Sequence, residues 1–199
     1  MAVMVIVSLA AVYLAHQSRS GGLTVKRQFG RTTVSRIRDV TSPGIVQLSG
    51  TVRELDDAPV SEASGRPYVA RDLRITIRDG GDGAPTRPAS NAVDFLLDDG
   101  TGVALVRARD AAVLIDRDFE APRTTLDQVP WLDALLRAGG YHNGSPARCR
   151  IDLREGVLSP GAAAGVVGHA EPADHEARML GATIIIRPID KTRVAIRAT

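Results

Sequence analysis

Four histidines are the residues of this chain best suited to bind a metal ion, and two of them lie close together in the sequence. His169 and His175 are separated by a short stretch that contains Glu171 and Asp174, so imidazole and carboxylate groups occur side by side. Neither HExxH nor another established spacing of metal ligands is present. We therefore expect these side chains on a surface loop, and the sequence predicts no metal site and no cofactor.

Groups suited to acid–base or nucleophilic catalysis are sparse. The adjacent Asp98 and Asp99 would point to opposite faces of a strand, which makes them poor acid–base partners and typical turn residues. Ser64 stands outside any GxSxG motif. Cys149 is the only cysteine, which excludes an intramolecular disulfide, and its place in an expected strand favours a packed thiol. The sequence predicts no catalytic residue, and a non-catalytic role is favoured over an enzymatic one.

The composition is that of a globular domain. Hydrophobic residues make up 44% of the 199 residues, charged residues 24% and aromatic residues only 4%, so the core must be built mainly from aliphatic side chains. The formal net charge of +2 is too small to indicate a nucleic-acid partner by itself.

Binding of single-stranded nucleic acid needs exposed aromatic side chains along a basic groove. The candidates for stacking are Tyr68, Phe95 and Phe119, and those for the phosphates are Arg74, Arg78, Arg107 and Arg109. Phe95 lies in an apolar run that favours burial. Nucleic-acid binding by an OB-type domain is therefore the alternative function, less expected than binding of a protein or peptide.

Residues 1–15 (MAVMVIVSLAAVYLA) contain no charged side chain. Three interpretations compete: an uncleaved signal anchor, a cleavable signal peptide, and a buried helix of the domain. A membrane-spanning helix needs about 20 apolar residues, so this segment is short for one. A signal peptide usually begins with basic residues, which are missing here. We favour a transmembrane anchor over residues 1–17.

A basic stretch follows the expected anchor. Because positive residues stay on the cytoplasmic side of a membrane, we expect a single-pass protein whose domain faces the cytoplasm. Residues 18–43 are predicted to form a basic juxtamembrane linker with a short helix over 33–40. Its candidates for contact with lipid headgroups are Arg19, Lys26, Arg27 and Arg31. The alternative is an ordinary solvated linker.

Residues 44–199 alternate apolar and polar side chains as half-buried strands do. Strands are predicted over 45–55, 68–78, 91–97, 103–108, 148–153, 166–168, 183–187 and 191–197. Loops are predicted over 56–67, 79–90 and 171–180. Residues 98–102 (DDGTG) are expected to form a hairpin turn, since Asp-Gly between apolar runs supplies a residue with positive φ. One helix is predicted over 126–138, opened by a capping box between Thr125 and Gln128.

These elements predict a fold that is mainly β with one helix. The nearest common architecture is a small OB-like β-barrel, with five strands and a helix between the third and fourth. We expect it to lie behind the N-terminal anchor helix.

The order of motifs in this region resembles a known family. The motifs are PGIVQLSGTV (43–52), PVSEASGRPYVARDLRI (59–75), FLLDDGTGVALV (95–106), REGVLSPG (154–161) and VVGHA (166–170). Together they resemble the GIDE domain, also called the BAM ("beside a membrane") domain, which occurs in a mitochondrial E3 ubiquitin ligase and in bacterial membrane proteins. The resemblance covers about 37–199 and implies a GIDE-like β-barrel domain over 44–199 that lies against a membrane.

This chain departs from the family pattern in two respects. No second apolar span follows the barrel in this sequence, although the domain usually lies between two such spans. A RING needs seven or eight cysteine and histidine zinc ligands, and Cys149 stands alone, so the resemblance does not extend to ubiquitin transfer.

The resemblance implies a membrane-anchored, non-catalytic interaction module whose partner is another protein or a peptide. The loop formed by Ser64, Gly65, Arg66 and Pro67 matches a motif of the family and is the first candidate for a contact surface; the alternative is a structural turn. An accessory subunit of a membrane-associated enzyme is a further alternative.

Overall fold

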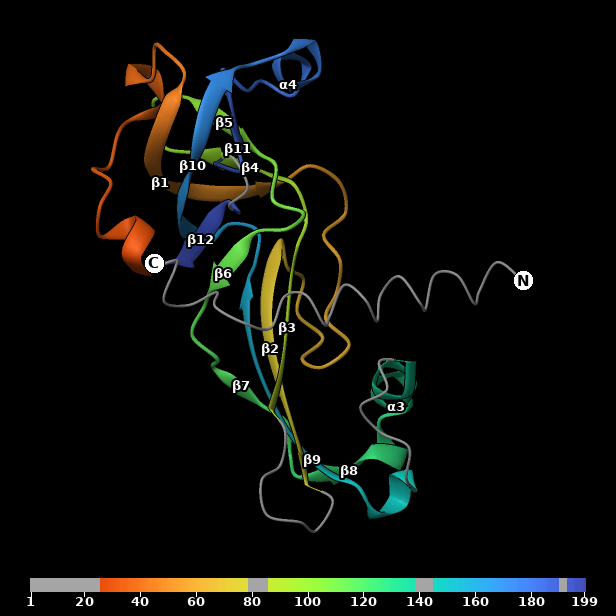
Figure 1. The fold of residues 1–199 in the computed structure, drawn as a ribbon. Coiled ribbons are helices and arrows are strands. Elements are labelled where there is room, and N and C mark those ends of the chain that lie inside the picture. Colours follow the sequence, from red (N-terminus) through yellow and green to blue (C-terminus); the bar gives the residue numbers. More distant parts are fainter. Residues whose placement is uncertain (1–25, 79–85, 139–144, 190–192) are drawn as a thin grey trace. The chain divides into compact units, whose positions relative to one another are not determined.

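The computed structural model describes residues 26–78, 86–138, 145–189 and 193–199 (Figure 1). The expected anchor over 1–17 lies outside these residues, as do Arg19, the first part of the 79–90 loop, and residues 191–192 of the last predicted strand. Within the described part of the chain, none of the helices has both the length and the apolar character needed to cross a membrane.

The described chain is mainly β with few helices, as the sequence predicted. Its strands are β1 (Gly44–Glu54), β2 (Ala70–Arg78), β3 (Thr86–Ala92), β4 (Phe95–Asp98), β5 (Val103–Val106), β6 (Ala112–Leu114), β7 (Phe119–Glu120), β8 (Thr124–Thr125), β9 (Arg150–Leu158), β10 (Ala163–Pro172), β11 (Ile184–Arg187) and β12 (Ala195–Ala198). Its helices are a turn over 26–29, η1 (Ile37–Asp39), η2 (Leu126–Gln128), α3 (Pro130–Ala138), η3 (Pro146–Arg148) and α4 (His175–Met179).

Five strands close into a barrel in the order β1-β4-β5-β11-β10, and β10 pairs back with β1 (Figure 1). All neighbours in this ring are antiparallel except β5 and β11, which are parallel. If the five barrel strands are numbered by their order in the chain, their order around the ring is 1-2-3-5-4. This arrangement is consistent with the expected OB-like Greek-key barrel.

The strand β10 pairs with β1 on one edge and with two successive strands on the other edge. One edge pairs with β1 over Ala163–Ala170, while the other pairs with β12 over Ala164–Val167 and then with β11 over His169–Pro172. Gly168 lies where the partner changes. A Cβ atom there would lie 2.8 Å from the carbonyl oxygen of Arg187, so the close approach of two backbones requires glycine.

The strand β1 pairs with β10 on one edge up to Thr51 and with β4 on its other edge from Thr51 to Glu54. At Gly50 a Cβ atom would lie 2.5 Å from the carbonyl oxygen of Asp98, so a close backbone contact requires glycine here as well.

Aliphatic side chains fill the barrel, as the composition required. In β1 the buried Leu48 and Val52 alternate with exposed residues, which is the period of a half-buried strand. They belong to a core with Phe95, Leu97, Ala104, Val106, Val166, Ile184 and Ile186. A smaller apolar cluster packs α4 onto the barrel through Leu96, Leu105, Ala173, Ala177, Ala182 and Ile185.

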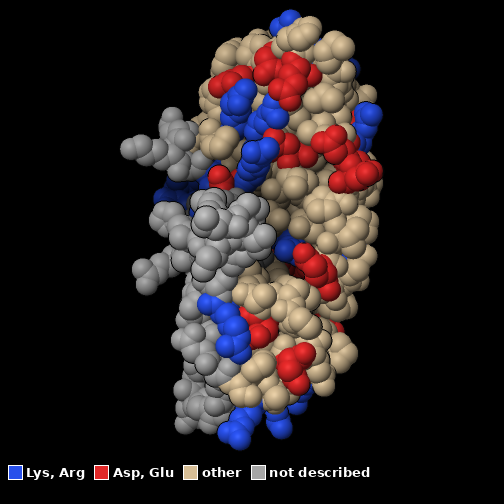
Figure 2. All heavy atoms as spheres, turned by 90° about the vertical axis from the view of Figure 1, so that its right-hand side faces the viewer, with Lys and Arg blue, Asp and Glu red and all other residues tan. Residues whose placement is uncertain are grey.

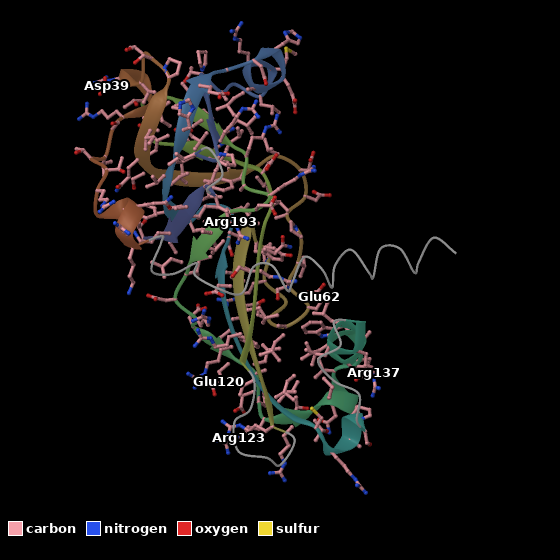
Figure 3. All side chains as sticks on the ribbon, viewed as in Figure 1. Asp39, Glu62, Glu120, Arg123, Arg137 and Arg193 are labelled. Atoms are coloured by element: carbon pink, nitrogen blue, oxygen red, sulfur yellow. The ribbon has the colours of Figure 1, made fainter. Side chains whose placement is uncertain are left out.

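The chain divides into two compact units. Of the described residues, those within 26–72, 90–116 and 156–199 form one unit, which contains the barrel; those within 73–89 and 117–155 form the other. In the second unit β7 and β8 pair with β9, and Leu126, Leu132, Leu136 and Ile151 are buried. Arg137 of α3, labelled in Figure 3, bonds Asp133 one turn earlier at 2.9 Å.

The helix predicted over 126–138 is interrupted at Val129. The residue before a proline is pushed out of the helical region, and Val129 accordingly has φ −132° and ψ 70°, so η2 ends there and α3 begins at Pro130. The predicted capping box is wrong: Thr125 makes no side-chain cap, and Gln128 instead bonds the Thr124 hydroxyl at 2.6 Å.

The helix predicted over 33–40 is also wrong except for the short η1. Val34 forms a parallel bridge with Gln47 of β1, and the Ser35 N–H donates to the Gln47 carbonyl at 2.8 Å. This pairing keeps the chain extended until Arg36.

Three other boundaries differ from those predicted. Residues 171–180 are not one loop, since they contain the end of β10 and then α4, whose N-terminus is capped by Asp174 accepting from the Ala177 N–H at 2.8 Å. The strand expected over 91–97 is divided between β3 and β4, and β3 begins inside the expected 79–90 loop. Cys149 precedes β9 and follows η3, although it is buried as expected.

The hairpin turn between β4 and β5 is confirmed, and Asp99 organises it. Its carboxylate accepts hydrogen bonds from the N–H groups of Thr101 and Gly102 at 2.8 and 3.0 Å, and from the Thr101 hydroxyl at 2.8 Å. The other carboxylate oxygen accepts from the Ile37 N–H of η1 at 2.7 Å. Burial of this carboxyl raises its pKa, but the hydrogen bonds together outweigh burial and hold the pKa of Asp99 below its usual value.

We predict that Gly50→Ala destabilises the protein by about 1–3 kcal/mol, because backbone atoms of Asp98 must move to admit the methyl group. Gly44→Ala is the matched control in the same strand, since a Cβ atom there meets nothing within 4 Å. Urea unfolding of the full-length variants measures both changes. Equal losses of stability would mean that the close contact at Gly50 is not the cause.

We predict that Asp99→Asn costs about 1–3 kcal/mol of unfolding free energy at neutral pH, because several donors lose a charged acceptor. The lowered pKa fixes the pH dependence. The stabilisation is complete above the pKa of unfolded aspartate, about 3.9, and is lost as the pH falls through the lower pKa of the folded protein.

When the free energy of unfolding is measured from neutral pH to pH 3, the difference between the wild type and Asp99→Asn should therefore shrink in acid. Asp98→Asn is the control, since that carboxylate accepts from one backbone N–H group, of Gly100 at 2.9 Å, and pairs with the exposed Arg53 guanidinium at 3.4 Å. If this difference in the free energy of unfolding stayed constant with pH, the stabilising role given to the Asp99 carboxylate would be refuted.

Candidate functional site

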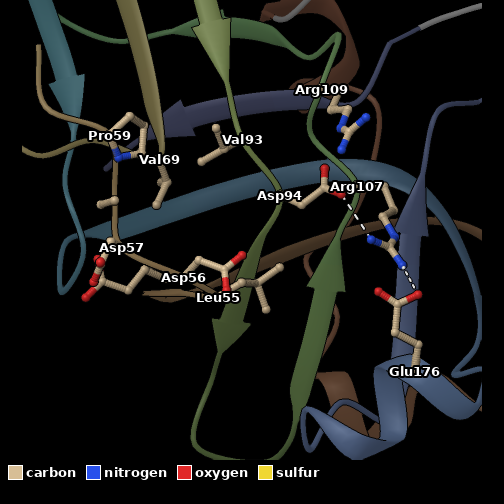
Figure 4. A pocket seen from close by; sticks show the side chains of 12 residues that line it. Leu55, Asp56, Asp57, Pro59, Val69, Val93, Asp94, Arg107, Arg109 and Glu176 are labelled. Carbon is tan, nitrogen blue, oxygen red and sulfur yellow. Dashed lines mark hydrogen bonds and ion pairs between the residues drawn. The ribbon is translucent and has the colours of Figure 1, made fainter.

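A pocket of about 400 Å³ opens at one end of the barrel. It is lined by the end of β1 and the loop after it (Glu54, Leu55, Asp56, Asp57, Ala58, Pro59), by Val69, by Val93 and Asp94 before β4, by Arg107 and Arg109 after β5, and by Glu176 of α4 (Figure 4). All these residues belong to the barrel unit. The pocket thus combines apolar walls with charged side chains, as ligand sites commonly do.

Arg107 crosses the pocket between two carboxylates (Figure 4). Its guanidinium bonds Asp94 and Glu176, each at 3.1 Å. The β4–β5 register pairs Phe95 with Val106, so Asp94 and Arg107 are the next cross-strand pair at the open end of this hairpin. The pKa of Arg107 is raised, mainly by the hydrogen bond to Asp94. Glu176 raises this pKa further, whereas burial lowers it.

Asp94 fixes the shape of this end of the barrel. Its second carboxylate oxygen accepts from the Ala108 N–H at 2.8 Å, so one side chain ties the entry to β4 to the chain leaving β5. Glu176 reaches Arg107 from α4, whose position is set by the cap at Asp174 and by packing of Ala177 against the barrel.

Carboxylates outnumber guanidinium groups in the lining. The pocket presents the side chains of five acidic residues and two arginines, and Arg107 already engages two of the carboxylates. Asp56 and Asp57 are exposed at the rim, and no hydrogen bond or ion pair with the rest of the described chain is recorded for their side chains. The free charge in the pocket is therefore negative.

The loops that line the pocket correspond to loops that contribute to ligand binding in OB barrels. In those folds the loops between strands one and two and between strands four and five frame the binding face. Here the corresponding connections are 55–94, which supplies most of the lining, and 173–183, which carries α4 and Glu176.

The predicted contact loop Ser64 to Pro67 forms a compact turn. Gly65 has φ +69° and donates its N–H to the Ser61 carbonyl at 2.9 Å, and the buried Ser61 bonds the Arg66 carbonyl in turn. The Pro67 carbonyl accepts from the Ser159 hydroxyl at 2.7 Å. Gly65 and Pro67 are exposed, whereas Ser64 and Arg66 are half-buried.

Glu62 and Arg71 brace this turn through an ion pair of 2.8 Å. Burial raises the pKa of Glu62, but the hydrogen bond from Arg71 and the other favourable contacts prevail and leave it lowered. The turn is thus internally bonded, and the structure brings none of Ser64 to Pro67 into the pocket lining.

The candidates for nucleic-acid stacking are mostly inaccessible. Tyr68 and Phe95 are buried, and Phe119 is half-buried. Among the arginines, Arg78 pairs with Asp152 at 2.7 Å and Arg107 is held in the pocket. Figure 2 shows acidic and basic side chains interspersed on the face that it presents.

His169 and His175 do not lie on a surface loop, where the sequence analysis expected them. His169 lies in β10 and His175 opens α4. Glu171, between them in the sequence, bonds Arg187 at 2.9 Å with His169 at 3.7 Å on its other side. Within the described residues, no group of three or more His, Cys, Asp or Glu side chains is arranged to hold a metal ion.

No protein family, curated protein or solved structure matches the chain. The similarity to the GIDE domain therefore stays a prediction from the sequence motifs.

Sequence reasoning missed most of the pocket. Of its lining, only Arg107 and Arg109 were singled out, and both were assigned to phosphate binding. A local signal for a charged strand end was present in the acidic residues at the end of β1 and after it, Glu54, Asp56 and Asp57. No local pattern in the sequence marks Asp94 or Glu176.

Proposed function

We propose that the barrel is a non-catalytic interaction module that binds a positively charged segment of a partner protein in the pocket. The observation that carries this proposal is the lining: apolar walls at Leu55, Val69 and Val93, surrounded by carboxylates that exceed the guanidinium groups. A lysine or arginine side chain fits such a site, because its apolar stem can lie along the walls while its charge meets the carboxylates.

The surroundings of the pocket support a peptide ligand. Among the exposed large apolar side chains of the described chain are Val60, Met179 and Leu180. Val60 follows the lining residue Pro59, and Met179 follows Glu176 by three residues, a spacing that places side chains on one helix face, with Leu180 directly after the helix. A segment that mixes basic and apolar residues would find both kinds of contact here.

The charge of the pocket argues against the nucleic-acid alternative. OB barrels that bind single strands rely on exposed aromatic side chains and a basic groove, whereas here Tyr68 and Phe95 are buried and the rim carries Asp56 and Asp57. A phosphate backbone would be repelled by these carboxylates.

The proposal keeps the membrane association expected from the sequence. The apolar 1–15 segment and the motifs that resemble the GIDE domain both support a barrel held beside a bilayer, where its partner would be a membrane-associated protein. Catalysis by this chain forms no part of the proposal, and an activity would reside in the partner.

The test is binding of a short fluorescent peptide that alternates arginine with leucine to the full-length protein, measured by fluorescence anisotropy. We predict that the double variant Asp56→Asn/Asp57→Asn weakens binding about three- to tenfold, since each exposed charge contact contributes roughly 0.2–1 kcal/mol. Binding should also weaken as the salt concentration rises.

The double variant Glu120→Gln/Asp127→Asn is the matched control, because it removes two exposed carboxylates outside the pocket. It should bind the peptide as the wild type does. Equal binding of a glutamate–leucine peptide, or a stronger salt-dependent binding of single-stranded oligothymidylate that the pocket variant leaves unchanged, would contradict the proposal.

A further inference from the structure

Residues 26–38, here called the basic strap, are attached to the outside of the barrel rather than free of it (Figure 1). Phe29 anchors the start of the strap: it is 8% exposed and packs with Ala112, Val167 and Ala195. A Cβ atom at Gly165 would lie 2.9 Å from its ring, so this glycine makes room for it.

Two further contacts hold the rest of the strap. In the amide orientation that satisfies both of its polar atoms, the buried Gln47 side chain donates its N–H groups to the carbonyls of Phe29 and Thr32 at 3.1 and 2.8 Å, while its backbone carbonyl accepts from the Ser35 N–H. At the far end, Ile37 is 1% exposed and its N–H bonds Asp99. The strap is therefore held at its beginning, middle and end.

The strap displays cations on the surface. The side chains of Lys26, Arg27, Arg31, Arg36 and Arg38 are all exposed. Arg38 lies 3.5 Å from Asp39, the acidic residue that follows the strap and is labelled in Figure 3. For the other four cations, no ion pair within the described chain is recorded. Their charge is thus available to an external anionic partner.

Two exposed apolar side chains lie in the strap and on the strand beside it. Val34 is 55% exposed and Ile45 is 57% exposed, and the rest of the exposed large apolar residues in the described chain are Val60, Met179 and Leu180. Val34 bridges Gln47, and Ile45 precedes Gln47 by two residues on the same face of β1. Val34 and Ile45 are therefore neighbours on the outer surface of the barrel unit.

We propose that this surface lies on an anionic lipid bilayer, with Val34 and Ile45 entering the interfacial region and the strap cations contacting headgroup phosphates. Basic residues are attracted to the negative surface of such a bilayer, and apolar side chains between them gain by leaving water for the acyl boundary. A nucleic acid would satisfy the cations but would offer no apolar layer to Val34 and Ile45, so the pair favours a bilayer.

The inference goes beyond the expected anchor over 1–17 and the expected headgroup contacts. It assigns the orientation of the barrel unit: the β1 face with the strap is turned towards the membrane. It also adds Arg36, Arg38, Val34 and Ile45 to the contact surface, and it is independent of the pocket.

The experiment places an environment-sensitive fluorophore at position 45 of the full-length protein through Ile45→Cys. The native Cys149 is fully buried, and the unsubstituted protein sets the labelling background. Emission is compared in vesicles of phosphatidylcholine alone and with added phosphatidylglycerol. We expect a blue shift, and quenching by nitroxide lipids, only in the vesicles that contain phosphatidylglycerol.

Two controls separate this contact from anchoring by residues 1–15. A label at Met179→Cys, which is 76% exposed on α4, should report water in both vesicles. In the Ile45→Cys background, Arg27→Glu/Arg31→Glu should abolish the blue shift, whereas Arg123→Glu/Arg148→Glu, which reverses two exposed arginines outside the strap, should preserve it.

Three results would overturn the proposal: a label at 45 that stays in water in phosphatidylglycerol vesicles, the same shift for labels at 45 and 179, or a shift that survives Arg27→Glu/Arg31→Glu. Displacement of the label from the vesicles by single-stranded oligothymidylate would assign the strap to nucleic acid instead.

Discussion

The architecture depends on the closure of the barrel between β1 and β10. These two strands pair along most of their length. On its other edge β10 changes partner from β12 to β11 at Gly168, and the other edge of β1 begins to pair with β4 just after Gly50. At both positions a neighbouring backbone approaches so closely that a side chain would displace it. Two missing side chains thus allow one sheet to curve into a ring and enclose an aliphatic core with almost no aromatic residues.

Both proposed surfaces follow from this closure. Ring formation brings the entry to β4, the exit from β5 and α4 to one end of the barrel, where Arg107 joins Asp94 and Glu176 and the remaining carboxylates face solvent. The basic strap lies on the outside of the closed barrel, where Phe29 packs against Ala112, Val167 and Ala195 and the Ile37 N–H donates to the Asp99 carboxylate. One surface is acidic and concave, and the other is basic with exposed apolar residues, so they suit partners of opposite charge.

The barrel could be predicted from the sequence more completely than the pocket. Alternation in β1 and the Asp-Gly turn at Asp99 are local signals, and both were correctly interpreted. The five residues of α4 are too few for a helical period, and only its cap at Asp174 marked it. The pocket combines residues far apart in the chain, such as Asp94 and Glu176, and their meeting follows from strand order around the ring, which no local pattern encodes.

Hydrogen exchange of the full-length protein, followed by mass spectrometry with and without the arginine–leucine peptide, tests the central claim most directly. The account predicts slower exchange in segments 54–59, 93–109 and 173–183, which frame the pocket, and unchanged exchange in the strap over 26–38. Protection confined to the strap or to the unit over 117–155, with the pocket segments unaffected by bound peptide, would contradict the assignment of this end of the barrel as the binding site.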